Sequence, residues 1–306
     1  MVRTVEFLSE MSILRGRLYL HAKSLKPQPI VIMAHGFSAT IDGMVADKFA
    51  EVIYEAGFAV LLYDHRNLGI SDGEPRQQIN RWIQARGYRD AINYVVTLPE
   101  IDKERIAIWG DSLSGAEVIV VGALDERVSA VIAQTPACGA ELPSDDPDGR
   151  LYESIKEKFL HGNVNGTPDE TTGPLPVVSF DQMNNPSLLK PLSAFRWFIE
   201  YGACHGTHWE NKATLVVPKT PAPFHPMLCV SHLSAPILMI IANQDEMSGA
   251  NPDVSRKVFD LAPDPKEKLE IEGGHFGLLY YPGKLFEQAS SAQKEFLLRY
   301  LRGCGV

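Results

Sequence analysis

The fold is decided by the stretch Ile106-Ala107-Ile108-Trp109-Gly110-Asp111-Ser112-Leu113-Ser114-Gly115-Ala116-Glu117. An apolar run is followed by small residues, and residues 116–123 are typical of a helix. This pattern predicts a strand, an abrupt turn and a helix, with Ser112 at the apex of the turn. Gly110-x-Ser112-x-Ser114 matches the pattern G-x-S-x-G, in which a strained turn exposes a serine, except at its last position. Alone, the motif also fits any glycine-rich turn.

The rest of the chain alternates apolar strands with amphipathic helices. Residues 2–7 and 13–21 alternate apolar and polar side chains, which predicts an antiparallel hairpin at a sheet edge. Further strands, most of them apolar on both faces, are expected at 30–34, 58–63, 106–110, 128–134, 236–242 and 268–271. Helices are expected at 47–56, 82–98, 116–123, 253–261 and 287–301. This order predicts an α/β fold with a mostly parallel, doubly wound sheet, whose ligands gather beyond the carboxyl ends of the strands.

The alternation breaks after Cys138, where proline and glycine recur and no strand pattern persists. We expect residues 138–225 to form an inserted, mainly helical cap over the strand ends, and residues 1–137 and 226–306 to form the core. Amphipathic pieces lie near 151–160 and 192–201. The aromatic residues of the cap could line an acyl pocket or form the cap's own small core, and the sequence leaves both open: Phe195, Trp197, Phe198, Tyr201 and Trp209.

Composition narrows the classes of function. Hydrophobic residues make up 45% of the 306 residues, so a sizeable core is expected. The net charge of −9 without a basic block argues against nucleic acid or an anionic membrane as a partner. No apolar run approaches the ~20 residues of a membrane span. The N-terminus lacks the apolar region of a signal peptide and the cysteines are far apart, which favours a reducing cytoplasm: Cys138, Cys204, Cys229 and Cys304.

Three polar residues follow the ends of three predicted strands, in the order Ser112, Asp245, His275. A serine hydroxyl keeps its proton at neutral pH, so a base must remove that proton during attack. His275 is the candidate base, and Asp245 would fix its tautomer and stabilise its positive charge. Backbone N–H groups would stabilise the oxyanion, and the candidates are those of Leu113 in the turn and of Phe37 after the strand at 30–34.

Other acidic residues compete with Asp245. Glu246 is adjacent, but the register of the strand end favours Asp245. Asp111 is expected on the surface of the turn, and Asp64 is expected to anchor its own loop through backbone hydrogen bonds.

The sequence predicts neither a metal site nor a cofactor. Cys204, His205 and His208 are metal-ligating residue types that lie close together near the end of the cap. No further pair of ligands has the spacing of a metal site, so a turn of the cap is the favoured interpretation.

The combined motifs resemble the α/β-hydrolase superfamily over residues 2–136 and 226–302. They are His35-Gly36-Phe37, Tyr63-Asp64-His65-Arg66-x-x-Gly69-x-Ser71-Asp72-Gly73, Gly110-Asp111-Ser112-Leu113-Ser114-Gly115, Asp245 and Gly274-His275. Residues 30–136 are similar to dienelactone-hydrolase-like enzymes and to the thiohydrolases and polyketide transferases of bacteria and fungi. The resemblance implies an α/β-hydrolase fold, with Ser112, Asp245 and His275 in the nucleophile, acid and base positions. A serine replaces the cysteine nucleophile of true dienelactone hydrolases, which argues against that activity.

We therefore expect a cofactor-independent serine hydrolase that cleaves a carboxylic ester or thioester through an acyl-serine intermediate. Two alternatives stay open: acyl transfer by the same triad, and a non-catalytic binding protein on the same fold. The expected partner is a small-molecule ester or thioester. The sequence leaves open whether the chain forms a homo-oligomer.

Overall fold

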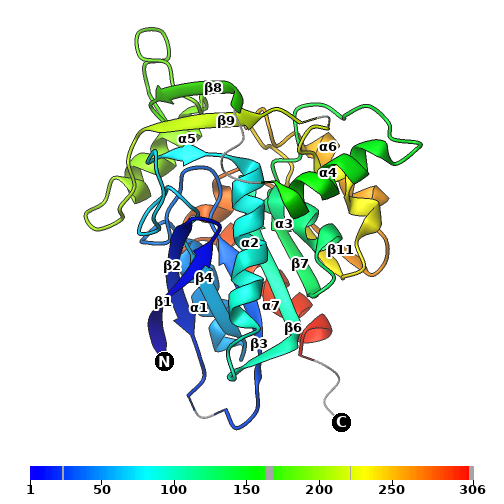
Figure 1. Ribbon diagram of the computed structural model, residues 1–306. Coiled ribbons are helices and arrows are strands. Elements are labelled where there is room, and N and C mark those ends of the chain that lie inside the picture. Colours follow the sequence, from blue (N-terminus) through cyan, green and yellow to red (C-terminus); the bar gives the residue numbers. More distant parts are fainter. Residues whose placement is uncertain (23, 163–167, 221, 303–306) are drawn as a thin grey trace.

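A mostly parallel sheet lies at the centre of the molecule (Figure 1), in the order β1-β2-β4-β3-β6-β7-β10-β11. The computed structural model describes all residues except 23, 163–167, 221 and 303–306. The first two strands pair antiparallel and form the predicted edge hairpin, whereas the other six run parallel. The strands are β1 (Val2–Ser9), β2 (Ser12–Tyr19), β3 (Gln28–Ala34), β4 (Ala59–Tyr63), β6 (Ile101–Asp111), β7 (Val128–Gln134), β10 (Ile237–Ala242) and β11 (Lys266–Ile271).

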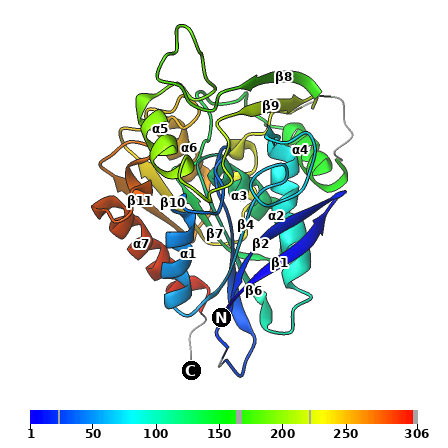
Figure 2. The same cartoon turned by 90° about the vertical axis from the view of Figure 1, so that its left-hand side faces the viewer.

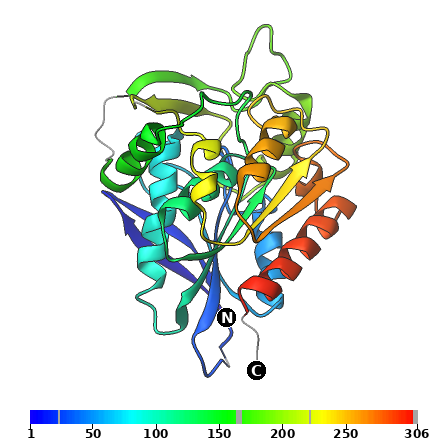
Figure 3. The ribbon, with the colours of Figure 1, turned by 90° about the vertical axis from the view of Figure 1, so that its right-hand side faces the viewer.

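Helices cover both faces of this sheet, as Figures 2 and 3 show. One layer contains α1 (Ala46–Glu55) and α7 (Lys284–Tyr300), and the other contains α2 (Arg81–Val95), α3 (Ser112–Leu124) and α6 (Pro252–Leu261). Strand β3 explains why the apolar runs are unbroken. Val31 and Met33 pack on the first layer, while Ile30, Ile32 and Ala34 pack on the second, and all of them are fully buried. The predicted doubly wound α/β fold is confirmed.

The segment between β7 and β10 lies at the end of the molecule opposite the N-terminus (Figures 1–3). It contains helices near the positions expected, α4 (Arg150–His161), α5 (Leu192–Trp197) and the π-helical turn η1 (Phe198–Gly202). It also contains β8 (Pro168–Leu175) and β9 (Ala213–Pro218), which form a small sheet with β5 (Gln78–Ile79) from the core. The sequence analysis did not predict these strands, because β8 is polar and interrupted by proline and glycine, as edge strands often are. Short 3-10 helices occur at η2 (Pro226–Leu228), η3 (Val230–His232) and η4 (Gly277–Leu279).

The turn at Ser112 is the tightest junction between a strand and a helix in the core. Strand β6 passes directly into α3, and Ser112 has φ of 53°, a strained value for a residue other than glycine. A Cβ atom on Gly110 would lie 2.3 Å from the carbonyl oxygen of Ser114. A Cβ atom on Gly115 would lie 3.0 Å from the carbonyl oxygen of Gln134 in β7. These two glycines therefore let the helix start against the sheet.

Ser114, the departure from the G-x-S-x-G pattern, fits this geometry. Its side chain is buried, and its Oγ lies 2.8 Å from the carbonyl oxygen of His35 and 2.8 Å from Nε2 of His65. The close approach to the neighbouring strand falls one position later, at Gly115. Position 114 therefore accepts a small polar side chain without loss of the turn.

Within the described residues, no helix combines the length and the apolar character that crossing a membrane requires.

We expect Gly110→Ala to destabilise the protein by about 1–3 kcal/mol, because the new methyl group would overlap the backbone of Ser114. Gly249→Ala is the matched control, since a Cβ atom there meets no atom within 4 Å. Urea-induced unfolding of both variants measures the difference. Equal stability of the two variants would show that the turn can relax around a side chain.

Candidate active site

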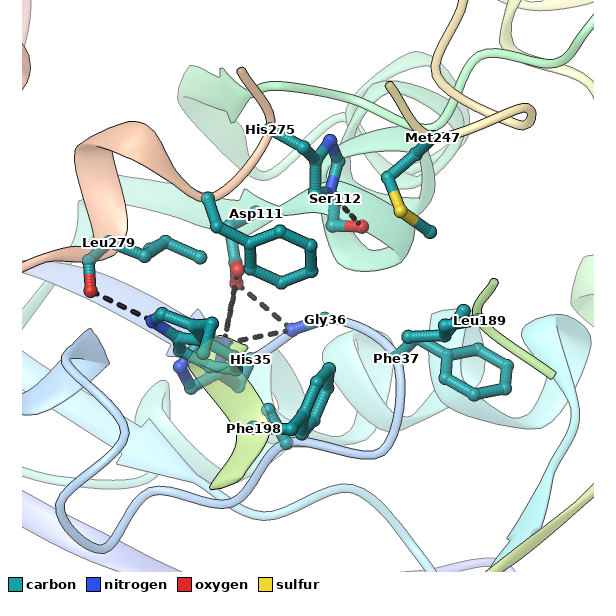
Figure 4. Close-up of a pocket in the computed structure, with 13 residues that line it drawn as sticks. His35, Gly36, Phe37, Asp111, Ser112, Leu189, Phe198, Met247, His275 and Leu279 are labelled. Atoms are coloured by element: carbon teal, nitrogen blue, oxygen red, sulfur yellow. Dashed lines mark hydrogen bonds and ion pairs between the residues drawn. The ribbon is translucent and has the colours of Figure 1, made fainter. Parts of the chain in front are cut away.

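The structure brings Ser112, His275 and Asp245 into one chain of hydrogen bonds. Ser112 opens α3, Asp245 follows β10, and His275 follows β11, so all three lie at the carboxyl ends of strands. Ser112 Oγ lies 2.8 Å from Nε2 of His275 (Figure 4), and Nδ1 of His275 lies 2.6 Å from Oδ2 of Asp245. This arrangement can move a proton from the hydroxyl to the imidazole while the carboxylate holds the ring.

The two adjacent acidic residues after β10 hold different parts of His275. Asp245 accepts from the imidazole ring and, through Oδ1, from the N–H of Met247 at 2.9 Å. Glu246 Oε2 accepts from the backbone N–H of His275 at 2.9 Å, and its Oε1 accepts from the hydroxyl of Ser193. The strand register favoured Asp245 over Glu246; in the structure Asp245 contacts the ring and Glu246 contacts the backbone of His275. Glu246 has a positioning role that the sequence did not indicate.

The environment of His275 makes its imidazole more basic. Burial of the ring, which is 2% exposed, opposes protonation. The hydrogen bond and the negative charge of Asp245, together with the charges of Glu246 and Asp111, outweigh burial and raise the pKa of His275 above its ordinary value. The ring is therefore a stronger base than a free imidazole.

Phe37 and Leu113 line the same cavity as Ser112, and each has a backbone N–H group. The N–H of Leu113 belongs to the first turn of α3, and the N–H of Phe37 lies in the loop after β3 (Figure 4). Neither group makes a hydrogen bond within the part of the chain that the structure describes. A Cβ atom on Gly36 would lie 2.9 Å from Cβ of Ser112, so only glycine lets this loop approach the serine so closely.

A second histidine and aspartate pair lies beneath the loop. Asp111 was expected on the surface of the turn, but it is 2% exposed, because β6 carries it into the centre of the sheet. Its Oδ1 lies 2.9 Å from Nδ1 of His35 and accepts from the N–H of Gly36 at 2.9 Å (Figure 4). Nε2 of His35 donates to the carbonyl oxygen of Met44. Burial opposes protonation of His35, but Asp111 and Met44 outweigh burial and raise its pKa. The pair fixes the turn that carries Phe37.

Asp64 is an anchor of its loop, as the sequence predicted. Its carboxylate accepts from the backbone N–H of Ile41 at 2.8 Å and of Ile70 at 2.9 Å. Burial raises the pKa of Asp64 to about 7.

The metal-ligating residue types of the inserted segment bind separate partners. Cys204 donates to the carbonyl oxygen of Glu200 at 2.9 Å, and Nδ1 of His208 lies 3.1 Å from a carboxylate oxygen of Asp42. Across the described residues, no group of three potential ligands gathers around one point. Cys138, Cys204 and Cys229 are free thiols, and Cys304 lies outside the described residues.

The aromatic residues of the inserted segment form a cluster with the core. The rings of Trp197 and Phe276 are tilted, with centroids 5.3 Å apart, and Phe198 stacks on Trp209 at 5.3 Å. Trp197 and Phe198 border a small recess of about 30 Å³ beside Ser112, whereas Phe195 and Tyr201 pack on the outside of the cluster. Packing between segment and core is therefore the main role of these side chains.

A larger cavity of about 670 Å³ opens beside Ser112 and His275. Its wall is mostly apolar and comes from the core and from the inserted segment, with Leu113, Trp82, Leu189, Leu215, Val217 and Phe224 among its residues. A cavity of this size and character accepts a small organic molecule.

Known proteins are similar to this chain in sequence and in fold. Residues 29–282 match the family described as alpha/beta hydrolase fold. Thiohydrolase aneE of Aspergillus aculeatus is 31% identical over 98% of this chain and 93% of its own. Polyketide transferase af380 of Aspergillus fumigatus is 26% identical over 94% of both chains. The crystal structure of the alpha/beta hydrolase GrgF from a Penicillium species superposes with a TM-score of 0.72 at 25% identity, covering 99% of both chains. The family match spans well over half of the chain, so this chain belongs to the α/β-hydrolase fold family.

Proposed function

We propose that this protein is a serine hydrolase that cleaves a carboxylic ester or thioester through an acyl-serine intermediate. The observation that carries the proposal is the hydrogen-bonded chain from Ser112 through His275 to Asp245, which opens on a largely apolar cavity. The similarity to a protein named a thiohydrolase, over nearly its full length, supports the same reaction class.

In the first half-reaction, Ser112 Oγ attacks the carbonyl carbon of the substrate, and its proton passes to Nε2 of His275. The negative charge that forms on the carbonyl oxygen accepts hydrogen bonds from the N–H groups of Phe37 and Leu113. Asp245 stabilises the imidazolium through Nδ1. The bond to the alcohol or thiol then breaks, and His275 returns the proton to the leaving group, which leaves an acyl-serine.

In the second half-reaction, water replaces the leaving group. His275 takes a proton from the water as its oxygen attacks the acyl carbon, and the same two N–H groups hold the second oxyanion. The bond to Ser112 Oγ breaks, the serine regains its proton from His275, and a carboxylic acid is released. The segment 138–225 acts as a cap in this proposal, since its residues form much of the cavity wall.

Acyl transfer is the second candidate, because one of the relatives is named a polyketide transferase. The first half-reaction is the same, and an alcohol or amine then replaces water. Product analysis in the presence of added alcohols distinguishes the two, since hydrolysis yields only the acid and transfer yields a new ester.

Ser112→Ala should lower the turnover of p-nitrophenyl butyrate by about 10⁴-fold or more, because no other group can form the acyl intermediate. The melting temperature should change little. Steady-state kinetics and labelling by a fluorophosphonate probe measure the effect, with the wild type as control. Turnover retained in the variant would place the nucleophile elsewhere, and a wild type that fails to label would favour a binding protein.

The acid limb of the pH profile of kcat/KM should have its midpoint above pH 6.5, because only neutral His275 is a base and its pKa is raised. Asp245→Asn should move this limb to lower pH and reduce kcat by about 10⁴-fold. Glu246→Gln is the matched control, since an amide oxygen can still accept from the N–H of His275. It should move the limb less and reduce kcat far less. An acid limb that both substitutions leave in place would mean that His275 does not control activity.

A further inference from the structure

One positively charged side chain stands out in the wall of the large cavity. Arg81 borders the same cavity as Ser112 and Leu113, among apolar side chains such as Trp82 and Phe224. Lys190 is the other cation in that wall, but it is exposed to solvent. Glu246, the acid of the wall, is already bound to His275 and Ser193. Arg81 is therefore the charged side chain of this cavity wall that could bind an anionic group of a substrate.

The guanidinium of Arg81 makes no direct ion pair in the described part of the chain. No hydrogen bond joins it to another described residue either, whereas Arg76 and Arg86, its neighbours in the sequence, bind carbonyl oxygens or a carboxylate. Partly buried charges are normally paired, because the loss of water is costly. The guanidinium stays protonated at neutral pH.

Glu117, Cys138 and His225 interact electrostatically with Arg81, but no hydrogen bond or ion pair joins any of them to its guanidinium. Burial raises the pKa of Glu117 far above its ordinary value and raises that of the Cys138 thiol to about 12, which weakens both as negative partners. The ring of His225 accepts from the N–H of Met227 and has a lowered pKa. None of these three groups is therefore a direct ionic partner of Arg81.

The position of Arg81 in the fold adds to this imbalance. Arg81 is the first residue of α2, a helix of 15 residues with no acidic side chain in its first turn. The N-terminal end of a helix carries a partial positive charge, which disfavours a cation and favours an anion. The side chain of Asn80 already caps the N–H groups of Trp82 and Ile83. Folding alone gives no reason for an arginine here.

We propose that Arg81 binds a carboxylate at the far end of the acyl group, and that the substrates are esters or thioesters of ω-carboxy acids. This rests on the proposed function. A guanidinium matches a carboxylate with two parallel hydrogen bonds, and the apolar wall between Arg81 and Ser112 packs on the methylene chain. The acyl group stays in the cavity through both half-reactions, so Arg81 holds it from binding until release.

The test compares p-nitrophenyl monoesters of adipic, suberic and sebacic acid with p-nitrophenyl hexanoate, octanoate and decanoate. At the best chain length the wild type should prefer the carboxylate by roughly 10- to 100-fold in kcat/KM. Arg81→Gln should remove this preference, and Arg81→Lys should keep part of it. Lys190→Gln removes the same charge from the cavity rim and should leave most of the preference. A purely structural role of Arg81 would lower both rates together and leave their ratio unchanged, which would overturn the proposal.

A binding measurement separates this proposal from the proposed catalytic mechanism. Titration calorimetry on Ser112→Ala with monomethyl suberate and methyl 8-hydroxyoctanoate requires no turnover. Tighter binding of the carboxylate, lost in Ser112→Ala/Arg81→Gln, supports the site even if Ser112 is not the nucleophile. Equal binding of the two esters overturns it. A preference seen only for 4-butyryloxybenzoate over p-nitrophenyl butyrate would place the carboxylate on the leaving group, which contradicts the assignment to the acyl side.

The melting temperature supplies a third readout. Arg81→Met should raise it, because the substitution removes an unmatched charge from an apolar wall. A lower melting temperature would show that Arg81 stabilises the fold through contacts of its own, and the proposal would be wrong.

Discussion

The site depends on the close approach of three backbone segments around Ser112. The strand β6, the first turn of α3 and the loop after β3 meet there, and glycines at 36, 110 and 115 leave no side chain between them. The strained φ of Ser112 is one consequence, because the chain must turn from strand to helix within a single residue. The other consequence is chemical. The same crowding places the hydroxyl of Ser112 within reach of His275. It also brings Phe37 and Leu113, whose N–H groups have no hydrogen-bond partner among the described residues, to the same cavity.

A buried pair formed by His35 and Asp111 holds these segments in position. Asp111 precedes the serine and His35 precedes Gly36, so their contact ties the two approaching segments together on the inner side of the site. Burying such a pair is costly, and it contributes little to stability compared with apolar packing. The pair instead determines the position of the loop after β3, because the carboxylate of Asp111 also accepts from the N–H of Gly36 and so fixes the peptide that leads to Phe37. The negative charge of Asp111 further raises the pKa of His275, which links the position of the loop to the strength of the base.

The sequence predicted what local patterns encode and missed what depends on distant contacts. Apolar runs and turn residues were sufficient for the core strands, for the order of Ser112, Asp245 and His275, and for the loop at Phe37. The buried position of Asp111 was missed, because a charged residue beside a turn is usually exposed. The strand β9 was missed, because its pairing with β5 joins residues more than a hundred positions apart. The strand β8, which pairs with β9, was missed because it is polar and interrupted by proline and glycine. The cavity could not be predicted either, since its wall combines residues of α2, α3, β9 and the turn after β10.

The acidic residues of the site lie around His275, and a cation, Arg81, lies in the cavity wall. This distribution of charge suits an acyl group that carries a carboxylate. Asp245, Glu246 and Asp111 surround His275 and strengthen it as a base, but they would also repel a substrate carboxylate that came close to the serine. The net charge of −9 adds a weak repulsion at long range, which salt screens within about 8 Å at physiological ionic strength. The guanidinium of Arg81, which has no direct ion pair among the described residues, provides a local positive charge in the apolar wall of the cavity. Such a cavity would hold the charged end of an acyl chain at Arg81 and the uncharged carbonyl at Ser112. The distribution of charge would then orient the substrate and also keep the pKa of His275 raised.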